Sequence, residues 1–103
     1  MPDTDQVFYL RHLVTTSIQL SAWKEERELD LHAHFYVRCE NDLDAGAVAA
    51  DYESRNGLTF VEYVSLPVPL SKSQIREYEP EHEDAFDVAL SGGFACVVSM
   101  VLA

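Results

Sequence analysis

The strongest constraint in this sequence is an alternation of apolar and polar side chains between residues 7 and 40, on both sides of a charged bend. Before the bend, the even positions from Phe8 to Leu20 are mostly apolar, and after it the odd positions from Leu29 to Cys39 are apolar. A period of two residues is typical of a β-strand with one buried face. The bend Lys24-Glu25-Glu26-Arg27 therefore predicts one long β-hairpin.

Residues that oppose each other in an antiparallel pair point to the same side of the sheet, so the even positions of the first arm must oppose odd positions of the second. A turn centred on Glu25 and Glu26 satisfies this rule. It predicts the pairs Leu20 with Leu31, Ile18 with Ala33, and Val14 with Val37. It also places His12 opposite Cys39 on the inward face, where we expect a hydrogen-bonded core histidine and no catalytic thiol.

The chain after the hairpin contains two predicted helices and two predicted strands. Asn41 is suited to cap a helix that ends at Asn56-Gly57. We expect Leu43, Ala47 and Ala50 to form its inward stripe. A strand follows from Leu58 to Leu66, and Pro67 and Pro69 end its pairing or confine it to a sheet edge.

Ser71 and Gln74 have the spacing of a capping box and open a short helical turn. Pro80 suits the first position of a second helix that reaches about Ser91. The final segment, from Phe94, is apolar without alternation and predicts a strand inside the sheet with both faces covered.

These elements predict an α+β fold in a single two-layer domain over residues 1–103, with residues 1–6 as a disordered tail. The long N-terminal hairpin would belong to a four-stranded mixed sheet, with the two helices packed mainly on one face in the order β-β-α-β-α-β. A chain of this length can bury one core but not two.

The formal net charge is -11, from 18 acidic and 7 basic residues. This charge argues against nucleic-acid or anionic-membrane binding, since both favour cationic surfaces. It is consistent with solubility, with adaptation to salt, or with a surface that blocks a basic site on another protein. Nothing resembles a targeting segment, so we expect a cytoplasmic protein with Cys39 and Cys96 as reduced thiols.

His32 and His34 lie on the outer face of the predicted hairpin and are weak candidates for metal ligands. Two imidazoles are too few, so a metal site would need His82 or a carboxylate from elsewhere. The chain contains no phosphate-binding loop, dinucleotide motif, nucleophile elbow or zinc cysteine pattern. We therefore predict no catalytic residues, no cofactor and a non-enzymatic protein.

The densest charge in the sequence lies between residues 77 and 87, where aromatic side chains accompany the acids. We expect an inhibitor or immunity-type protein, or a nucleic-acid mimic such as a mobile-element anti-defence protein, that blocks a basic site on a partner. The predicted contact residues are Glu77, Tyr78, Glu79, Glu81, Glu83, Asp84 and Asp87, with Tyr36 and Trp23 as buried anchors in the complex.

Two alternatives belong to other functional classes. One is a small-ligand or metal-dependent enzyme that uses the polar hairpin face with His32 and His34. The other is a homo-oligomeric structural protein, for example a homodimer, that associates through the same face or through the proline-ended strand.

Overall fold

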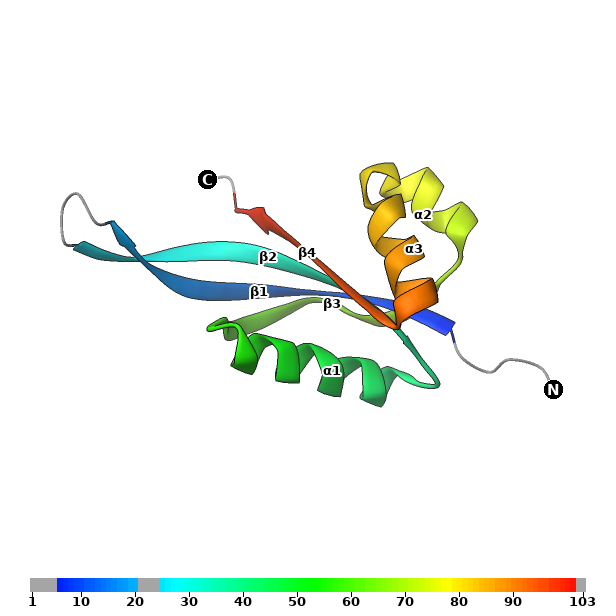
Figure 1. The fold of residues 1–103 in the computed structure, drawn as a ribbon, viewed down its shortest axis with the longest axis horizontal. Coiled ribbons are helices and arrows are strands. Elements are labelled where there is room, and N and C mark those ends of the chain that lie inside the picture. The colour runs from blue at the N-terminus through cyan, green and yellow to red at the C-terminus, as the bar shows by residue number, and fades with distance from the viewer. Residues whose placement is uncertain (1–5, 21–24, 102–103) are drawn as a thin grey trace.

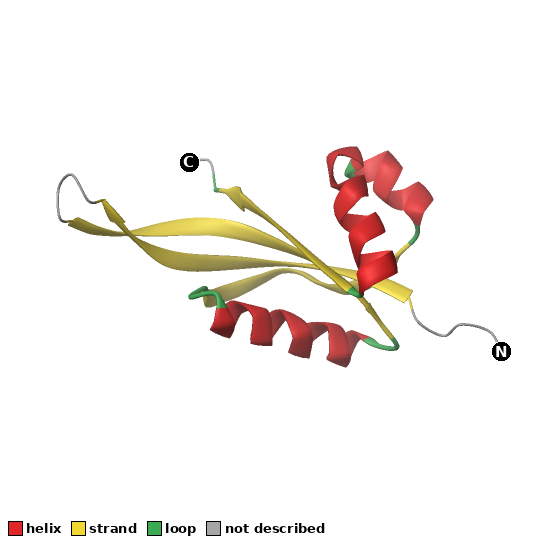
Figure 2. Ribbon diagram, viewed as in Figure 1, coloured by secondary structure: helices red, strands yellow, loops and turns green. Residues whose placement is uncertain are grey.

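The computed structural model describes residues 6–20 and 25–101, which form one sheet with helices on both of its faces (Figures 1 and 2). In chain order the elements are β1 (Gln6–Leu20), β2 (Glu25–Cys39), α1 (Asp42–Arg55), β3 (Thr59–Leu70), α2 (Lys72–Tyr78), the 3-10 helix η1 (Pro80–His82), α3 (Glu83–Gly92) and β4 (Phe94–Met100). Of the expected tail, residues 1–5 lie outside the described residues, and Gln6 begins β1.

The strand order is β3-β1-β2-β4, and every neighbouring pair is antiparallel. The α+β class and the long hairpin are confirmed, whereas the predicted mixed sheet is wrong. α1 joins β2 to β3, which run in the same direction but are separated by β1. The second connection, through α2, η1 and α3, runs from one edge of the sheet to the other.

The register of the hairpin differs from the predicted one, although its parity is correct. Leu10 lies opposite Phe35 and Val14 opposite Leu31, while Glu25 and Glu26 belong to β2 and not to the turn. Any shift by an even number of residues keeps the same side chains on each face, so parity alone does not fix the register. The observed register places large apolar residues opposite each other where the helices cover the sheet. His12 consequently lies opposite Ala33, and Cys39 opposite Gln6.

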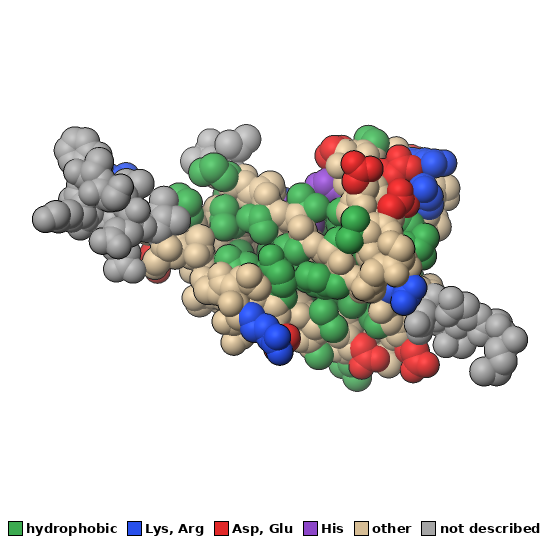
Figure 3. Space-filling model, viewed as in Figure 1, with side chains coloured by type: hydrophobic (Ala, Val, Ile, Leu, Met, Phe, Trp, Pro, Cys, Tyr) green, Lys and Arg blue, Asp and Glu red, His purple; other side chains and the backbone are tan. Residues whose placement is uncertain are grey.

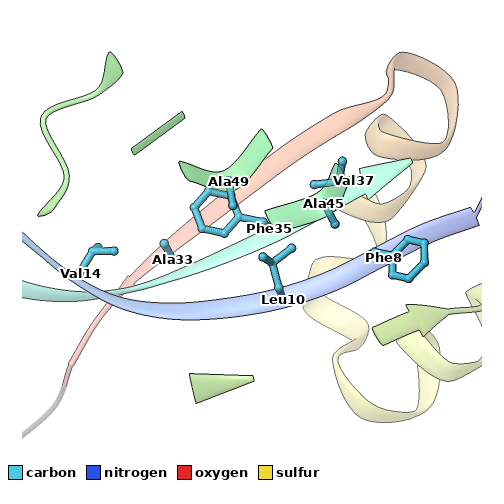
Figure 4. Packing of buried hydrophobic residues seen from close by; sticks show 8 residues of the cluster. All are labelled: Phe8, Leu10, Val14, Ala33, Phe35, Val37, Ala45 and Ala49. Carbon is cyan, nitrogen blue, oxygen red and sulfur yellow. The ribbon is translucent and has the colours of Figure 1, made fainter. Parts of the chain in front are cut away.

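Each face of the sheet is covered by a different helical layer (Figure 1). α1 packs on the face that holds Leu10 and Phe35, where Ala45 and Ala49 let it approach closely (Figure 4). The opposite face is covered by α2 and α3, which bury Val7, Tyr36, Ile75, Phe86 and Ala89. The prediction of helices mainly on one face is therefore wrong. The end of the hairpin that holds Val7 and Tyr36 is apolar on its second face too, and that face also has to be buried.

The helix ends agree with the predicted caps, but the inward face of α1 does not agree with the predicted stripe. The side chain of Asn41 accepts a hydrogen bond from the backbone of Asp44, and Ser71 forms its capping box with Gln74. The predicted helix from Pro80 to Ser91 is divided into η1 and α3. In α1 the buried residues are Ala45, Ala49 and Glu53, whereas Leu43 is 81% exposed.

Both edges of the sheet expose apolar side chains. β3 is an edge strand that contains Pro67 and Pro69, in agreement with the prediction. β4 is the opposite edge, so its predicted place inside the sheet is wrong, and Val98 and Met100 are 44% and 62% exposed. Both cysteines are free thiols. Among the described residues, no helix is long and apolar enough to cross a membrane.

We expect Phe35→Ala to lower the free energy of unfolding by about 3–5 kcal/mol, because it removes a fully buried ring and leaves a cavity beneath α1. Urea denaturation followed by circular dichroism measures this loss. Leu43→Ala is the control, since this exposed side chain on α1 should cost less than about 0.5 kcal/mol. Equal losses in the two variants would contradict the observed orientation of α1.

Candidate functional site

A polar network lies under α2 and η1, on the face of the hairpin where the sequence predicted exposed histidines. The hydroxyl of the fully buried Tyr36 hydrogen-bonds with Nδ1 of His82 at 2.7 Å. The hydroxyl of Tyr9 hydrogen-bonds with Nδ1 of His34 at 3.0 Å. The rings of His34 and His82 pack edge to face with centroids 4.8 Å apart. The fold thus brings together imidazoles from β2 and η1 that are distant in the sequence.

Burial determines the protonation of this network. Desolvation, followed by the positive charges of His82, Arg11 and His32, lowers the pKa of His34 to about 4. Desolvation also raises the pKa of Tyr36 and of Tyr9. At neutral pH His34 and both phenols are therefore uncharged.

His32 and His34 are both engaged in hydrogen bonds and do not form a metal site as a pair. Nε2 of His34 lies 3.3 Å from Oγ of Ser99, and Nδ1 of His32 accepts a bond of 3.1 Å from Nε of Arg11. The structure instead groups His82 with Glu79 and Glu81 beside the network. Burial and then a hydrogen bond with Glu81 raise the pKa of Glu79, whereas hydrogen bonds to its own backbone and to Glu79 lower the pKa of Glu81.

The predicted acidic contact residues lie on α2, η1 and α3, but only some of them present uncompensated charge. Glu83 pairs with Arg76 at 2.6 Å, and Asp87 pairs with Lys72 at 3.0 Å. Figure 3 shows acidic and basic side chains next to each other over these helices. Within the described part of the chain, Glu77 and Asp84 are exposed and form no ion pair.

The predicted aromatic contacts divide into three cases. Tyr78 is 70% exposed at the end of α2, beside a small pocket of about 180 Å³. Tyr36 is fully buried and hydrogen-bonded inside the protein, so it is not part of a contact surface. Trp23 lies outside the described residues.

On the other face of the sheet, a buried hydrogen bond between a histidine and a glutamate lies at the floor of a groove between α1 and β3. Nδ1 of His12 lies 2.7 Å from Oε2 of Glu53, and both side chains are almost fully buried. Nε2 of His12 is buried without a hydrogen-bond partner, and the ring packs against Phe60 and Tyr63 with centroids 5.0 and 5.2 Å away. The predicted hydrogen-bonded core histidine is thus confirmed.

The groove itself has a volume of about 700 Å³ and a mostly apolar lining. Gly46 and Ala50 form its wall on α1, and Phe60, Tyr63 and Leu66 form its wall on β3. Because the side chains of α1 are small here, they leave the space between helix and strand unfilled. The sequence predicts an inward stripe that includes Ala50, but a stripe of this kind does not by itself indicate a groove.

We expect the stability of the protein to fall below pH 6.5, because the unfolded chain protonates His34 while the folded chain keeps it neutral down to about pH 4. The stabilisation is therefore complete above pH 6.5 and decreases as the pH falls toward 4. Between pH 7 and pH 5 this group should cost roughly 2 kcal/mol. Urea denaturation of the wild type and His34→Gln at both pH values isolates the effect. A proton NMR titration of His34 with a midpoint near 6.5 would contradict it.

The surface of the described residues thus carries two distinct features: acidic side chains on α2, η1 and α3, and a mostly apolar groove between α1 and β3. The acidic residues were named from the sequence, whereas the groove was not predicted, because it depends on residues from β1, α1 and β3. The chain matches no family model, no curated protein and no solved structure.

Proposed function

We propose that this protein is a small non-catalytic module that binds a basic, apolar-faced segment of another protein through β3 and the groove beside α1. The observation that supports it best is the exposure of six large apolar side chains on one strand, each between 40% and 63% exposed: Phe60, Val61, Tyr63, Val64, Leu66 and Val68. An apolar surface of this kind on a small protein is typical of a protein-binding site.

The groove supplies the concave part of this docking surface. Its volume of about 700 Å³ is large enough to accept one or more side chains of a partner. Aromatic residues on its β3 wall, Phe60 and Tyr63, are the type of residue that contributes most to binding energy. The partner is held through side chains, since Pro67, Pro69 and the register shifts against β1 prevent a further strand from pairing along all of β3.

The negative charge of the protein favours a partner with basic side chains. Asp42 lies at the groove and Asp44 is exposed on the same helix, whereas Asp51 pairs with Arg55 at 3.0 Å. With a net charge of -11, the protein attracts a basic segment and repels a second copy of itself at this surface. The exposed carboxylates of Glu77, Glu81 and Asp84 add long-range attraction. If the partner binds nucleic acid, these carboxylates take the place of phosphates, and the module acts as an inhibitor.

Two synthetic amphipathic peptides with the same apolar face, one with lysines and one with glutamates on the polar face, test this function by fluorescence anisotropy. We expect the lysine peptide to bind, and to bind more weakly as salt increases, because screening reduces its attraction to the acidic surface. Ala50→Phe, which fills the groove, should weaken binding about tenfold or more. Ala47→Phe is the matched control on the exposed face of α1. Equal binding of both peptides, or equal effects of both variants, would reject the proposal.

A second candidate function, self-association, is favoured by the edge strand β4. Residues 94–101 contain no charged residue and no proline, and β4 pairs on one side only, with β2. Edge strands of monomeric proteins are usually protected by charges, prolines or bulges, and β4 has none of these. Figure 3 shows hydrophobic side chains gathered along this strand and between it and α1. Two copies could therefore join β4 to β4 and form one continuous sheet.

Light scattering over a range of protein concentrations tests this second candidate. We expect a dimer that Val98→Lys converts to a monomer, because a lysine on an edge strand opposes pairing. Val88→Lys is the control, since Val88 is similarly exposed on α3 but lies off the edge. A wild-type protein that stays monomeric at every concentration would reject self-association.

A further inference from the structure

Within residues 6–20 and 25–101, one buried side-chain nitrogen has no hydrogen-bond partner: Nε2 of His12. The side chain of His12 is 4% exposed, and its other ring nitrogen, Nδ1, lies 2.7 Å from Oε2 of Glu53. The two nitrogens of an imidazole ring point in different directions, so Nε2 is turned away from Glu53. Buried polar atoms in proteins are almost always paired, because an unpaired one destabilises the fold. His12 therefore offers a hydrogen-bonding group that the described residues do not use.

His12 lies at the floor of the groove between α1 and β3. Both His12 and Glu53 line this groove, whose volume is about 700 Å³ and whose lining is otherwise mostly apolar. The rings of Phe60 and Tyr63 pack edge to face against the imidazole, with centroids 5.0 and 5.2 Å away. These two rings are 40% and 63% exposed on an edge strand, and exposed side chains change rotamer within nanoseconds. Rotation of one of these rings would open a path from the groove to Nε2.

The lining of the groove and this nitrogen together favour an occupant with an apolar body and one hydroxyl group. A hydroxyl both donates and accepts, so it can pair with Nε2 whether or not that nitrogen carries a proton. Lysine, arginine and tryptophan side chains only donate, and a carboxylate only accepts. A carboxylate is also repelled by Asp42 at the groove. Among amino-acid side chains, an aromatic ring that ends in a hydroxyl is found only in tyrosine.

We propose that the basic segment that docks at β3 inserts a tyrosine into the groove, where the tyrosine hydroxyl hydrogen-bonds with Nε2 of His12. This inference rests on the proposed docking function, because the tyrosine belongs to the same segment. The inserted ring packs against Phe60 and Tyr63, and aromatic pairs of this kind add to the energy of burial. Tyrosine is also one of the residues that contribute most to binding at protein interfaces.

Two versions of the lysine peptide, identical except for a tyrosine or a phenylalanine at the centre of the apolar face, test this inference by fluorescence anisotropy. We expect the full-length protein to bind the tyrosine peptide about three- to tenfold more tightly, which is the usual gain from one added hydrogen bond. Without that bond, phenylalanine would bind at least as tightly, since it has no hydroxyl to desolvate. Equal or tighter binding of the phenylalanine peptide would overturn the inference and leave the docking function standing.

A double variant, His12→Leu with Glu53→Leu, removes the hydrogen-bonding nitrogen and its partner together, so neither group is left buried alone. We expect this variant to bind the tyrosine peptide no more tightly than the phenylalanine peptide. His32→Leu is the control, because it removes a histidine from the opposite face of the sheet and should keep the tyrosine preference. Circular dichroism checks that both variants are folded. A folded double variant that keeps the preference would contradict a contact with Nε2.

Nitrogen NMR of the His12 ring in the wild-type protein is a measurement that needs no variant. The probes are p-cresol and toluene, which correspond to the side chains of tyrosine and phenylalanine. We expect p-cresol, and not toluene, to shift the Nε2 resonance, because only p-cresol has a hydroxyl. If neither lysine peptide binds, the docking function is rejected, and the p-cresol titration still tests the tyrosine pocket. Equal responses to p-cresol and toluene would reject that pocket.

Discussion

The antiparallel pairing of β1 with β2 places apolar residues on both faces of the same end of the hairpin. Leu10 and Phe35 point to one face, and Val7 and Tyr36 point to the other, so each face needs its own cover. α1 covers the first face on its way from β2 to β3. The connection from β3 to β4 must then cross the second face. Toward the turn, the second face holds polar pairs such as Ser17 with Glu28, and the hairpin extends beyond its helices (Figure 1).

Two buried histidines then fix how each helical layer is oriented on the sheet. A polar group that leaves water must find a hydrogen-bond partner, or its burial is costly. His12 hydrogen-bonds with Glu53. This bond requires the side of α1 that holds Glu53 to point toward the sheet, so Leu43 points toward solvent. His82 hydrogen-bonds with Tyr36, and this bond holds η1 on the opposite face of the sheet. The groove and the turn at Glu79 therefore both result from polar bonds within largely apolar layers.

Features that depend on residues close together in the sequence could be predicted, and features that depend on contacts between distant segments could not. The caps at Asn41 and Ser71 depend on residues three positions away, and both were predicted correctly. The register of the hairpin, the rotation of α1 and the covering of both faces depend on contacts between distant segments. From the sequence, Glu53 is expected to be exposed to solvent, because nothing near it in the chain indicates that His12 lies beside it. β4 was misplaced because an apolar edge strand has the same composition as a strand in the core.

Charge distribution separates the two apolar surfaces at the sheet edges. The groove beside β3 is flanked by the aspartates of α1, and repulsion between like charges acts over about 10 Å at moderate salt, so the close approach of two identical acidic grooves is unfavourable. β4 contains no charge along residues 94–101, so the same electrostatic cost is smaller there. A basic partner at the groove and a second copy at β4 are therefore compatible, because they occupy opposite edges of one sheet. The negative charge of the protein therefore favours a basic partner at the β3 edge, and it does not prevent association with a second copy at the β4 edge.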